Sequence, residues 1–307
     1  MKVNNSLASE KKVCIGTATF GLRYGITNQE GKLSIKEIER ILARSLESGI
    51  FQIDTAQAYG DAEKRLGQIG VKKFQVITKV SPPRNIHEFK KWNITQALEM
   101  SLGRLNLESC HGFLLHDTAS LHNGRGAQIA RQMHQVKSEN KAFHIGFSTY
   151  DPMEAELLCE RYEFDLVQLP YNILDRRAGE CGAIARLNKK GIAVHVRSVF
   201  LQGLLLSEPM GGHQNSNLPI QLVQEFHQAC QKYKVGPLRA ALGYVLQEEA
   251  ISSVVVGCAS LKEWEEILIA LKQPRVNLSW SPRAGFKKEM LDPRTWRKGS
   301  LSPACTQ

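Results

Sequence analysis

Several familiar features are missing from this sequence, and each absence narrows the class of protein. No run of about 18 apolar residues occurs, and residues 1–12 are polar without an apolar h-region, so neither a membrane-spanning helix nor a secretory signal is expected. The seven cysteines are scattered and form no C-x-x-C pair, which indicates free thiols in a reducing, cytoplasmic compartment. The nine histidines show no H-x-x-x-H spacing, so no metal site is expected.

Positive charge is in excess but is not gathered into one stripe. Lysine and arginine number 40 against 30 aspartate and glutamate, which gives a net charge of +10 and attracts anions. Aromatic residues make up only 7% of the chain, and no basic patch with interleaved aromatics stands out. We therefore expect solvated surface charge that favours a phosphorylated cofactor, with no nucleic-acid or membrane partner.

Short apolar runs rich in β-branched residues alternate with longer segments of helical period. Eight runs are predicted as strands buried on both faces, as in a parallel sheet. They are Val13–Ile15, Ile50–Asp54, Phe74–Thr78, Gly112–Leu115, His144–Phe147, Leu166–Leu169, Ile192–Val196 and Ser253–Val256. This unbroken alternation closes most naturally as a (β/α)8 TIM barrel, an α/β fold for which 307 residues is an ordinary length.

Helix boundary signals follow the same pattern. Ser34, with Glu37 three residues later, forms a capping-box sequence, and Gly49 is expected to end that helix. Asp151 and Pro152 are typical of the first turn of another helix. Strands and helices therefore succeed one another without a domain boundary.

We expect one domain over residues 1–307, with the barrel core at about 12–272. Two irregular segments interrupt the pattern, namely 198–219 after the seventh strand and the C-terminal extension 273–298. Both are candidates for substrate contact, because barrel enzymes build their sites from loops at one end of the strands. Residues 299–307 are expected to form a disordered tail.

Four ionisable residues lie at or just after three successive predicted strands. Asp54, Lys79 and His116 end strands two, three and four, and Tyr59 follows Asp54 by five residues. Polar residues at the C-terminal ends of barrel strands are typical of active sites. Taken singly, each has a simpler explanation as a cap, a packing residue or a surface charge. The prediction depends on all four occurring in order.

These residue types suit hydride transfer to a carbonyl group. The alkoxide that forms needs a proton, which a tyrosine can supply if its ordinary pKa of about 10 is lowered. A lysine ammonium favours the phenolate, and Asp54 would supply the counter-ion that a buried Lys79 needs. His116 would donate a hydrogen bond to the substrate oxygen and orient it. Tyr59 is therefore the predicted general acid.

Longer stretches of the chain resemble one family. Asp54–Gly60, Thr78–Lys79 and Leu115–His116 resemble the catalytic tetrad of the aldo-keto reductases. Other family-like stretches follow in the same order, namely Gly16–Gly21, Ser101–Leu105, Gly146–Thr149 and Gln168–Asn172. The resemblance covers about residues 12–272. It implies a barrel that transfers a hydride between a nicotinamide cofactor and a carbonyl or alcohol substrate.

The resemblance also implies a role for each matching residue. The four ionisable residues would act as described above. Ser148, Thr149 and Gln168 would contact the nicotinamide carboxamide, and Arg197 would stack on the nicotinamide ring. The other predicted cofactor contacts are Gly16, Thr17 and Ala18 after the first strand, Ser198, Gln202, Gly203 and Leu204 along the pyrophosphate, and Gly257, Ser260, Lys262 and Glu266 near the adenosine.

The sequence departs from the family's pattern in two places. Thr149 stands where an asparagine is usual, and its shorter hydroxyl weakens one expected carboxamide contact. After the eighth strand, the family often supplies a lysine, an arginine and an asparagine to the adenosine end. Here those positions hold Gly257, Glu263 and Ile267, so the usual grip on a 2′-phosphate is missing.

The start of the last helix carries residues that could bind a 2′-phosphate and others that would repel it. Ser260 and Lys262 could bind a phosphate at the helix N-terminus, which is a natural anion site. Glu263 and Glu266 would repel it. The cofactor is therefore expected to be NADP(H) or NAD(H), with NADP(H) slightly favoured and no metal.

Two other functions stay open from the sequence alone. The chain could be a non-catalytic, cofactor-binding regulatory subunit, or a lyase that uses Lys79 as a Schiff-base amine. The segments Arg197–Leu206 and Leu291–Trp296 look like those of reductases associated with sugar and cell-surface polysaccharide metabolism, so a sugar or sugar derivative is one expected carbonyl substrate. The protein is expected to be a monomer.

Overall fold

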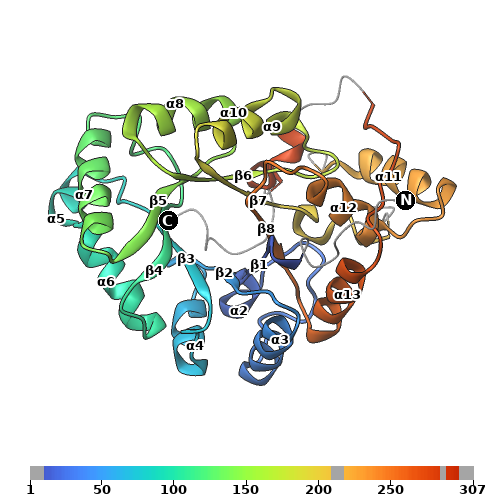
Figure 1. Ribbon diagram of the computed structural model, residues 1–307, viewed down its shortest axis with the longest axis horizontal. Coiled ribbons are helices and arrows are strands. Elements are labelled where there is room, and N and C mark those ends of the chain that lie inside the picture. The colour runs from blue at the N-terminus through green and yellow to red at the C-terminus, as the bar shows by residue number, and fades with distance from the viewer. Residues whose placement is uncertain (1–9, 209–217, 284–287, 297–307) are drawn as a thin grey trace.

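The computed structural model describes residues 10–208, 218–283 and 288–296, and its centre is a closed barrel of parallel strands (Figure 1). The strands are β1 (Val13–Gly16), β2 (Gln52–Asp54), β3 (Gln75–Val80), β4 (Cys110–Leu115), β5 (Ala142–Ser148), β6 (Leu166–Pro170), β7 (Ala193–Arg197) and β8 (Ser253–Gly257). They follow one another round the barrel in chain order, and β1 pairs with β8 to close it. The predicted (β/α)8 fold is confirmed.

The observed strands differ from the predicted ones only at their ends. β2 begins at Gln52 because the backbone N–H of Ile50 donates to Ser45 O, which closes the turn after the preceding helix. β3 runs on to Val80, which pairs with Leu115 of β4. Each strand lies where the apolar runs predict it.

Helices surround the barrel and cover the outer side of its strands (Figure 1). They are α2 (Ala18–Gly21), α3 (Ile35–Glu47), α4 (Ala62–Ile69), α5 (Ile86–Lys91), α6 (Ile94–Leu105), α7 (Gly126–Ser138), α8 (Pro152–Tyr162), α9 (Arg177–Glu180), α10 (Ala183–Lys189), α11 (Ile220–Lys232), α12 (Pro237–Leu246) and α13 (Leu261–Lys272). The predicted capping box of Ser34 and Glu37 is present, and Asp151 caps α8. Within the described residues, no helix is both long and apolar enough to cross a membrane.

Alternating side chains along each strand divide the core into an outer and an inner part. On β1, Val13 and Ile15 pack with the helices in the main core cluster, whereas Cys14 belongs to a separate small cluster. That inner cluster takes Cys14, Ile77, Leu114, Leu166 and Val255 from five different strands. Residues two positions further along these strands share the inward direction and lie nearer the C-terminal mouth of the barrel.

The two irregular segments contain short turns and share one core cluster. The segment after β7 includes η1 (Leu201–Gly203), and the C-terminal extension includes η2 (Lys288–Leu291) and η3 (Pro293–Thr295). Leu291 and Trp296 are buried in a second core cluster that also contains Leu201, Leu204 and Leu205. The C-terminal extension is therefore anchored on the loop after β7. The predicted tail, 299–307, lies outside the described residues.

Candidate active site

Asp54 and Lys79 form an ion pair inside the barrel mouth. Both belong to the inward rows of their strands, and Lys79 lies two residues after Ile77 of the inner cluster. The Lys79 Nζ donates to Asp54 Oδ1 at 2.5 Å and to the backbone oxygen of Thr55 at 2.8 Å. Burial lowers the pKa of Lys79, and the facing Asp54 carboxylate opposes this effect. The pair is almost fully enclosed, with 1% of Lys79 and 2% of Asp54 exposed.

Tyr59 and His116 lie beside this pair. The Lys79 Nζ is 5.1 Å from the centre of the Tyr59 ring, and the rings of Tyr59 and His116 are 5.6 Å apart at 78°. Close backbone packing fixes the tyrosine loop, because a Cβ on Gly21 would lie 1.8 Å from the Tyr59 carbonyl oxygen. The four ionisable residues that the sequence singles out therefore meet at one place.

His116 is held as a neutral imidazole. Its backbone N–H donates to Val80 O at 2.8 Å, which continues the pairing of β3 with β4. Burial, together with the positive charges of Lys79 and Arg197, lowers the pKa of its ring to about 3. Around neutral pH the ring can therefore donate one hydrogen bond to a substrate oxygen without carrying a charge.

Gln168 joins the site through a contact that the sequence does not reveal. Its Nε2 donates to Asp54 Oδ2 at 2.7 Å, so the carboxylate is shared between Lys79 and Gln168. Its Oε1 is buried and accepts no hydrogen bond from any described residue. A buried acceptor without a partner is costly, and the amide N–H of a carboxamide would satisfy it. The residues present therefore fit a nicotinamide at this point.

Contacts at the ends of β5 and β7 bring two of the predicted cofactor residues together and turn a third away. Ser148 Oγ accepts from Arg197 Nε at 3.2 Å, so these two predicted residues lie together. The Thr149 hydroxyl instead donates to Glu154 of α8 and accepts from the backbone N–H of Asp151 at 3.1 Å. The Thr149 side chain is thus engaged with the first turn of α8.

The loop after β7 has an unusual backbone. Ser198, Leu201, Gln202 and Gly203 all have positive φ, at 61°, 50°, 58° and 89°. The first three are non-glycine residues in a region that such residues rarely adopt, and strain of this kind clusters at functional sites. Asn172 Nδ2 holds the loop through Ser198 O at 3.0 Å. Leu204 is buried in the second core cluster and so anchors the loop to the core.

The loop after β1 contributes mainly by packing. Gly16 pairs with Asp54 on one side and with Gly257 on the other. Thr17 is buried, and both its backbone N–H and its hydroxyl donate to the Asp54 carbonyl oxygen at 3.0 Å. Ala18 begins α2. Thr17 therefore fixes the end of β2, where Asp54 lies.

The start of α13 is capped by the chain itself. Ser260 Oγ accepts from the backbone N–H of Glu263 at 3.2 Å, and Glu263 Oε2 accepts from the backbone N–H of Ala259 at 2.6 Å. Lys262 and Glu266 are exposed on the same helix. The Glu263 carboxylate thus accepts from one backbone donor, the N–H of Ala259, and places a negative charge beside this helix N-terminus, where an anion would otherwise bind.

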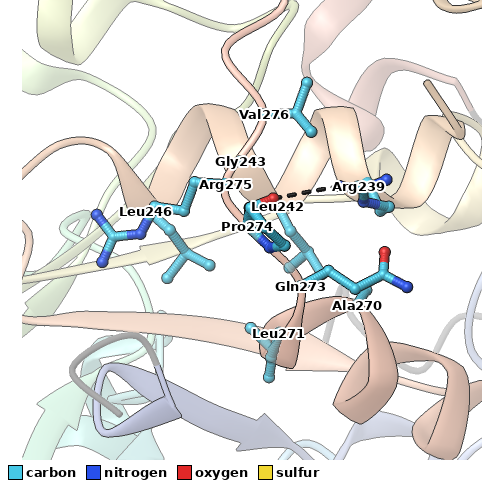
Figure 2. Close-up of a pocket in the computed structure, with 10 residues that line it drawn as sticks. All are labelled: Arg239, Leu242, Gly243, Leu246, Ala270, Leu271, Gln273, Pro274, Arg275 and Val276. Atoms are coloured by element: carbon cyan, nitrogen blue, oxygen red, sulfur yellow. Dashed lines mark hydrogen bonds between the residues drawn. The ribbon is translucent and has the colours of Figure 1, made fainter. Parts of the chain in front are cut away.

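A small cavity on the flank of the barrel is separate from these residues. Figure 2 shows that it lies between α12 and α13, where Arg239 donates to Pro274 O at 3.2 Å. Its lining includes residues 273–276 at the start of the C-terminal extension, but none of the predicted catalytic or cofactor-binding residues. Among the described residues, no group of three or more His, Cys, Asp or Glu side chains is placed to hold a metal ion.

Comparison with known proteins places the chain in a family. The model of the aldo/keto reductase family matches residues 12–278. The chain belongs to the aldo/keto reductase family. It is an NAD(P)H-dependent oxidoreductase, as members and reductase-named relatives of this family are.

Individual relatives in this family are distant. An "L-glyceraldehyde 3-phosphate reductase" of Escherichia coli O157:H7 is 24% identical over 85% of each chain. An "NADH-specific methylglyoxal reductase" of Escherichia coli K12 is 25% identical over 75% of this chain and 80% of the relative. An aldo-keto reductase of Bacillus halodurans, 18% identical, shares the fold with a TM-score of 0.68 over 95% of this chain and 94% of its own.

Proposed function

We propose that this protein reduces an aldehyde or ketone to the alcohol, with Tyr59 as the proton donor. When bound, the nicotinamide supplies a hydride to the carbonyl carbon, and the carbonyl oxygen takes a proton from the phenol. The observation that carries the proposal is the buried Lys79–Asp54 pair, whose ammonium lies 5.1 Å from the Tyr59 ring. The ammonium stabilises the phenolate left after proton transfer, and Asp54 holds the ammonium in place.

His116 supports the same step as a neutral donor. Its ring lies edge-on to Tyr59 at 5.6 Å, so one carbonyl oxygen can receive the tyrosine proton and an imidazole N–H bond together. A charged imidazolium would compete with Tyr59 as the acid. The low pKa of His116, about 3 because of burial, removes that competition near neutral pH.

Replacing the phenol tests this assignment. We expect Tyr59→Phe to slow hydride transfer at least about 100-fold, the lower limit for loss of a general acid, while binding of the dinucleotide stays near the wild-type value. Single-turnover absorbance of the reduced nicotinamide measures the step directly. Tyr233→Phe, which changes an exposed tyrosine at the C-terminal end of α11, is the matched control. Hydride transfer at the wild-type rate in Tyr59→Phe would remove Tyr59 from the mechanism.

For the cofactor, we propose NADH rather than NADPH. The Glu263 carboxylate lies at the start of α13, where it accepts from the backbone N–H of Ala259, and its negative charge would repel a 2′-phosphate at this helix N-terminus. A relative named as NADH-specific supports this choice. The expected preference therefore changes from NADP(H), slightly favoured by the sequence, to NADH.

Side-by-side fluorescence titration with NADH and NADPH tests the preference. Wild type should bind NADH more tightly. Glu263→Gln keeps the cap but removes the charge, and Glu263→Arg reverses it, so the preference for NADPH should rise in that order. If neither variant changes the ratio of the two affinities, Glu263 does not select the cofactor.

The structure gives less support to the two other functions, a Schiff-base lyase and a regulatory subunit. A Schiff base on Lys79 requires its nitrogen to reach a carbonyl carbon, but that nitrogen is enclosed and donates to Asp54 and Thr55. A purely regulatory role does not need a complete Tyr59, Lys79, Asp54 and His116 arrangement. The first substrates to test are small polar carbonyl compounds, such as those named for the two relatives, followed by sugar aldehydes.

A further inference from the structure

Tyr150 contacts two guanidinium groups beside the predicted cofactor site. It follows β5 directly after Thr149. The Cζ of Arg197 is 4.0 Å from the centre of its ring, and the Cζ of Arg294 is 3.7 Å from it. Both guanidinium groups are therefore within cation–π distance of the same ring. One aromatic ring thus joins the end of β7 to the C-terminal extension.

The polar contacts of Arg197 hold it only loosely. Its guanidinium donates to Ser148 Oγ at 3.2 Å, to Ser198 Oγ at 3.3 Å and to Thr149 O at 3.3 Å. These distances are at or beyond the long end of the N–H···O range, and all three acceptors are neutral. Within the described parts of the chain, no carboxylate forms an ion pair with Arg197. Contact with the ring of Tyr150 is therefore a main restraint on its orientation.

Arg294 is held in place by contacts within the C-terminal extension. Its Nε and a terminal nitrogen donate to the Asp292 carboxylate at 2.6 to 3.0 Å. The turn that carries it is anchored by Leu291 and Trp296, both buried in the second core cluster, and Trp296 Nε1 donates to Met290 O at 2.8 Å. The C-terminal extension therefore presents Arg294 to Tyr150 from a well-packed base.

We propose that Tyr150 and Arg294 are positioning residues that hold Arg197 as the flat surface on which the nicotinamide ring stacks. The inference rests on the proposed function, because it requires a dinucleotide at the barrel mouth. A guanidinium is planar and stacks well on a ring, but only if its own orientation is fixed. Arg294 restrains Tyr150, Tyr150 restrains Arg197, and Arg197 contacts Ser148, the predicted partner of the carboxamide.

Two ligands separate the nicotinamide end of the cofactor from the rest. Wild type and variants are titrated with the reduced dinucleotide and with ADP-ribose, which lacks the nicotinamide. If NADPH binds better than NADH, the 2′-phosphorylated form of ADP-ribose is used instead. We expect Tyr150→Leu to weaken dinucleotide binding about threefold to tenfold, as loss of a cation–π contact predicts, and to leave ADP-ribose binding unchanged. Tyr150→Phe keeps the ring and should bind both ligands as wild type does.

Variants of Arg294 test its contact with the Tyr150 ring. Arg294→Gln should weaken dinucleotide binding less than Tyr150→Leu does, and Arg294→Lys should restore part of the loss. The matched control is Arg283→Gln, which removes another arginine of the C-terminal extension that pairs with Glu225 instead. This control should change neither affinity. Thermal unfolding of each variant verifies that it is folded.

A double-mutant cycle then asks whether Tyr150 acts through Arg197. In an Arg197→Leu background, Tyr150→Leu should cause no further loss of dinucleotide affinity. Additive losses, or equal losses for the dinucleotide and ADP-ribose, would overturn the positioning role. Failure of the wild-type protein to bind any nicotinamide dinucleotide would refute the proposed function instead, so the two failures are distinguishable.

Discussion

Acid should destabilise this barrel through His195, a buried histidine of β7 that plays no part in the proposed reaction. Its side chain is 4% exposed, and its Nδ1 has no hydrogen-bond partner among the described residues. Burial lowers its pKa to about 3, and the nearby charges of His111, His144 and Lys79 act in the same direction. In the unfolded chain the pKa returns to about 6.5.

The sign of the effect follows from these two values. Between pH 6.5 and 3 the unfolded chain binds a proton at His195 that the folded protein does not, so the free energy of unfolding falls as the pH decreases through this window. Above it, the contribution is constant. The loss is about 1.4 kcal/mol for each pH unit, or about 2 kcal/mol at pH 5. His116 adds to the slope over the same window, because its pKa is also about 3.

Urea denaturation at several pH values between about 7.5 and 5 measures this slope. We expect His195→Gln to flatten it by about 1 kcal/mol per pH unit, whatever its stability at neutral pH. His87→Gln on α5 changes an exposed histidine and should keep the wild-type slope. If His195→Gln and wild type lose stability in parallel as the pH falls, His195 does not stay neutral in the folded barrel and the reasoning is wrong.

Two further variants test the buried pair and the strained loop. Lys79→Met leaves the buried Asp54 carboxylate without its cation, so the free energy of unfolding should fall by about 3–5 kcal/mol, and adding Asp54→Asn should recover part of it; a double variant less stable than Lys79→Met would contradict this. Gly203→Ala and Gly31→Ala both place a side chain at positive φ, but only the first brings its Cβ within 2.1 Å of Thr27 Oγ1. Gly203→Ala should therefore be about 1 kcal/mol less stable than Gly31→Ala in urea denaturation and should also weaken dinucleotide binding. If the two variants lose the same stability and bind the dinucleotide equally well, this account of the loop is wrong.

Local signals predicted the barrel because each of its strands is specified by its own stretch of chain. Apolar runs located all eight strands, and the capping box at Ser34 located the start of α3. The strand ends were less accurate, since they depend on partners. The backbone of Ile50 turns back to Ser45, and Val80 is held by Leu115 across the sheet. Neither contact is visible in the local pattern.

The same distinction divides the site. Asp54, Tyr59, Lys79 and His116 could be grouped from the sequence, because parallel strands in chain order bring their C-terminal ends to one mouth. The fit of Glu263 into the first turn of α13 could not, since a sequence shows the charge of this residue but not the backbone donor that it occupies.

Contacts between distant parts of the chain are what the sequence could least reveal. The C-terminal extension has no helical or strand period, so it was predicted only as a candidate for substrate contact. In the structure the buried side chains of Leu291 and Trp296 join it to the core cluster that contains the loop after β7, and this anchoring places Arg294 against Tyr150 from a point 144 residues away in sequence. A segment without regular structure can therefore define the mouth of the barrel as firmly as a strand does, because a few buried side chains fix where its polar residues lie.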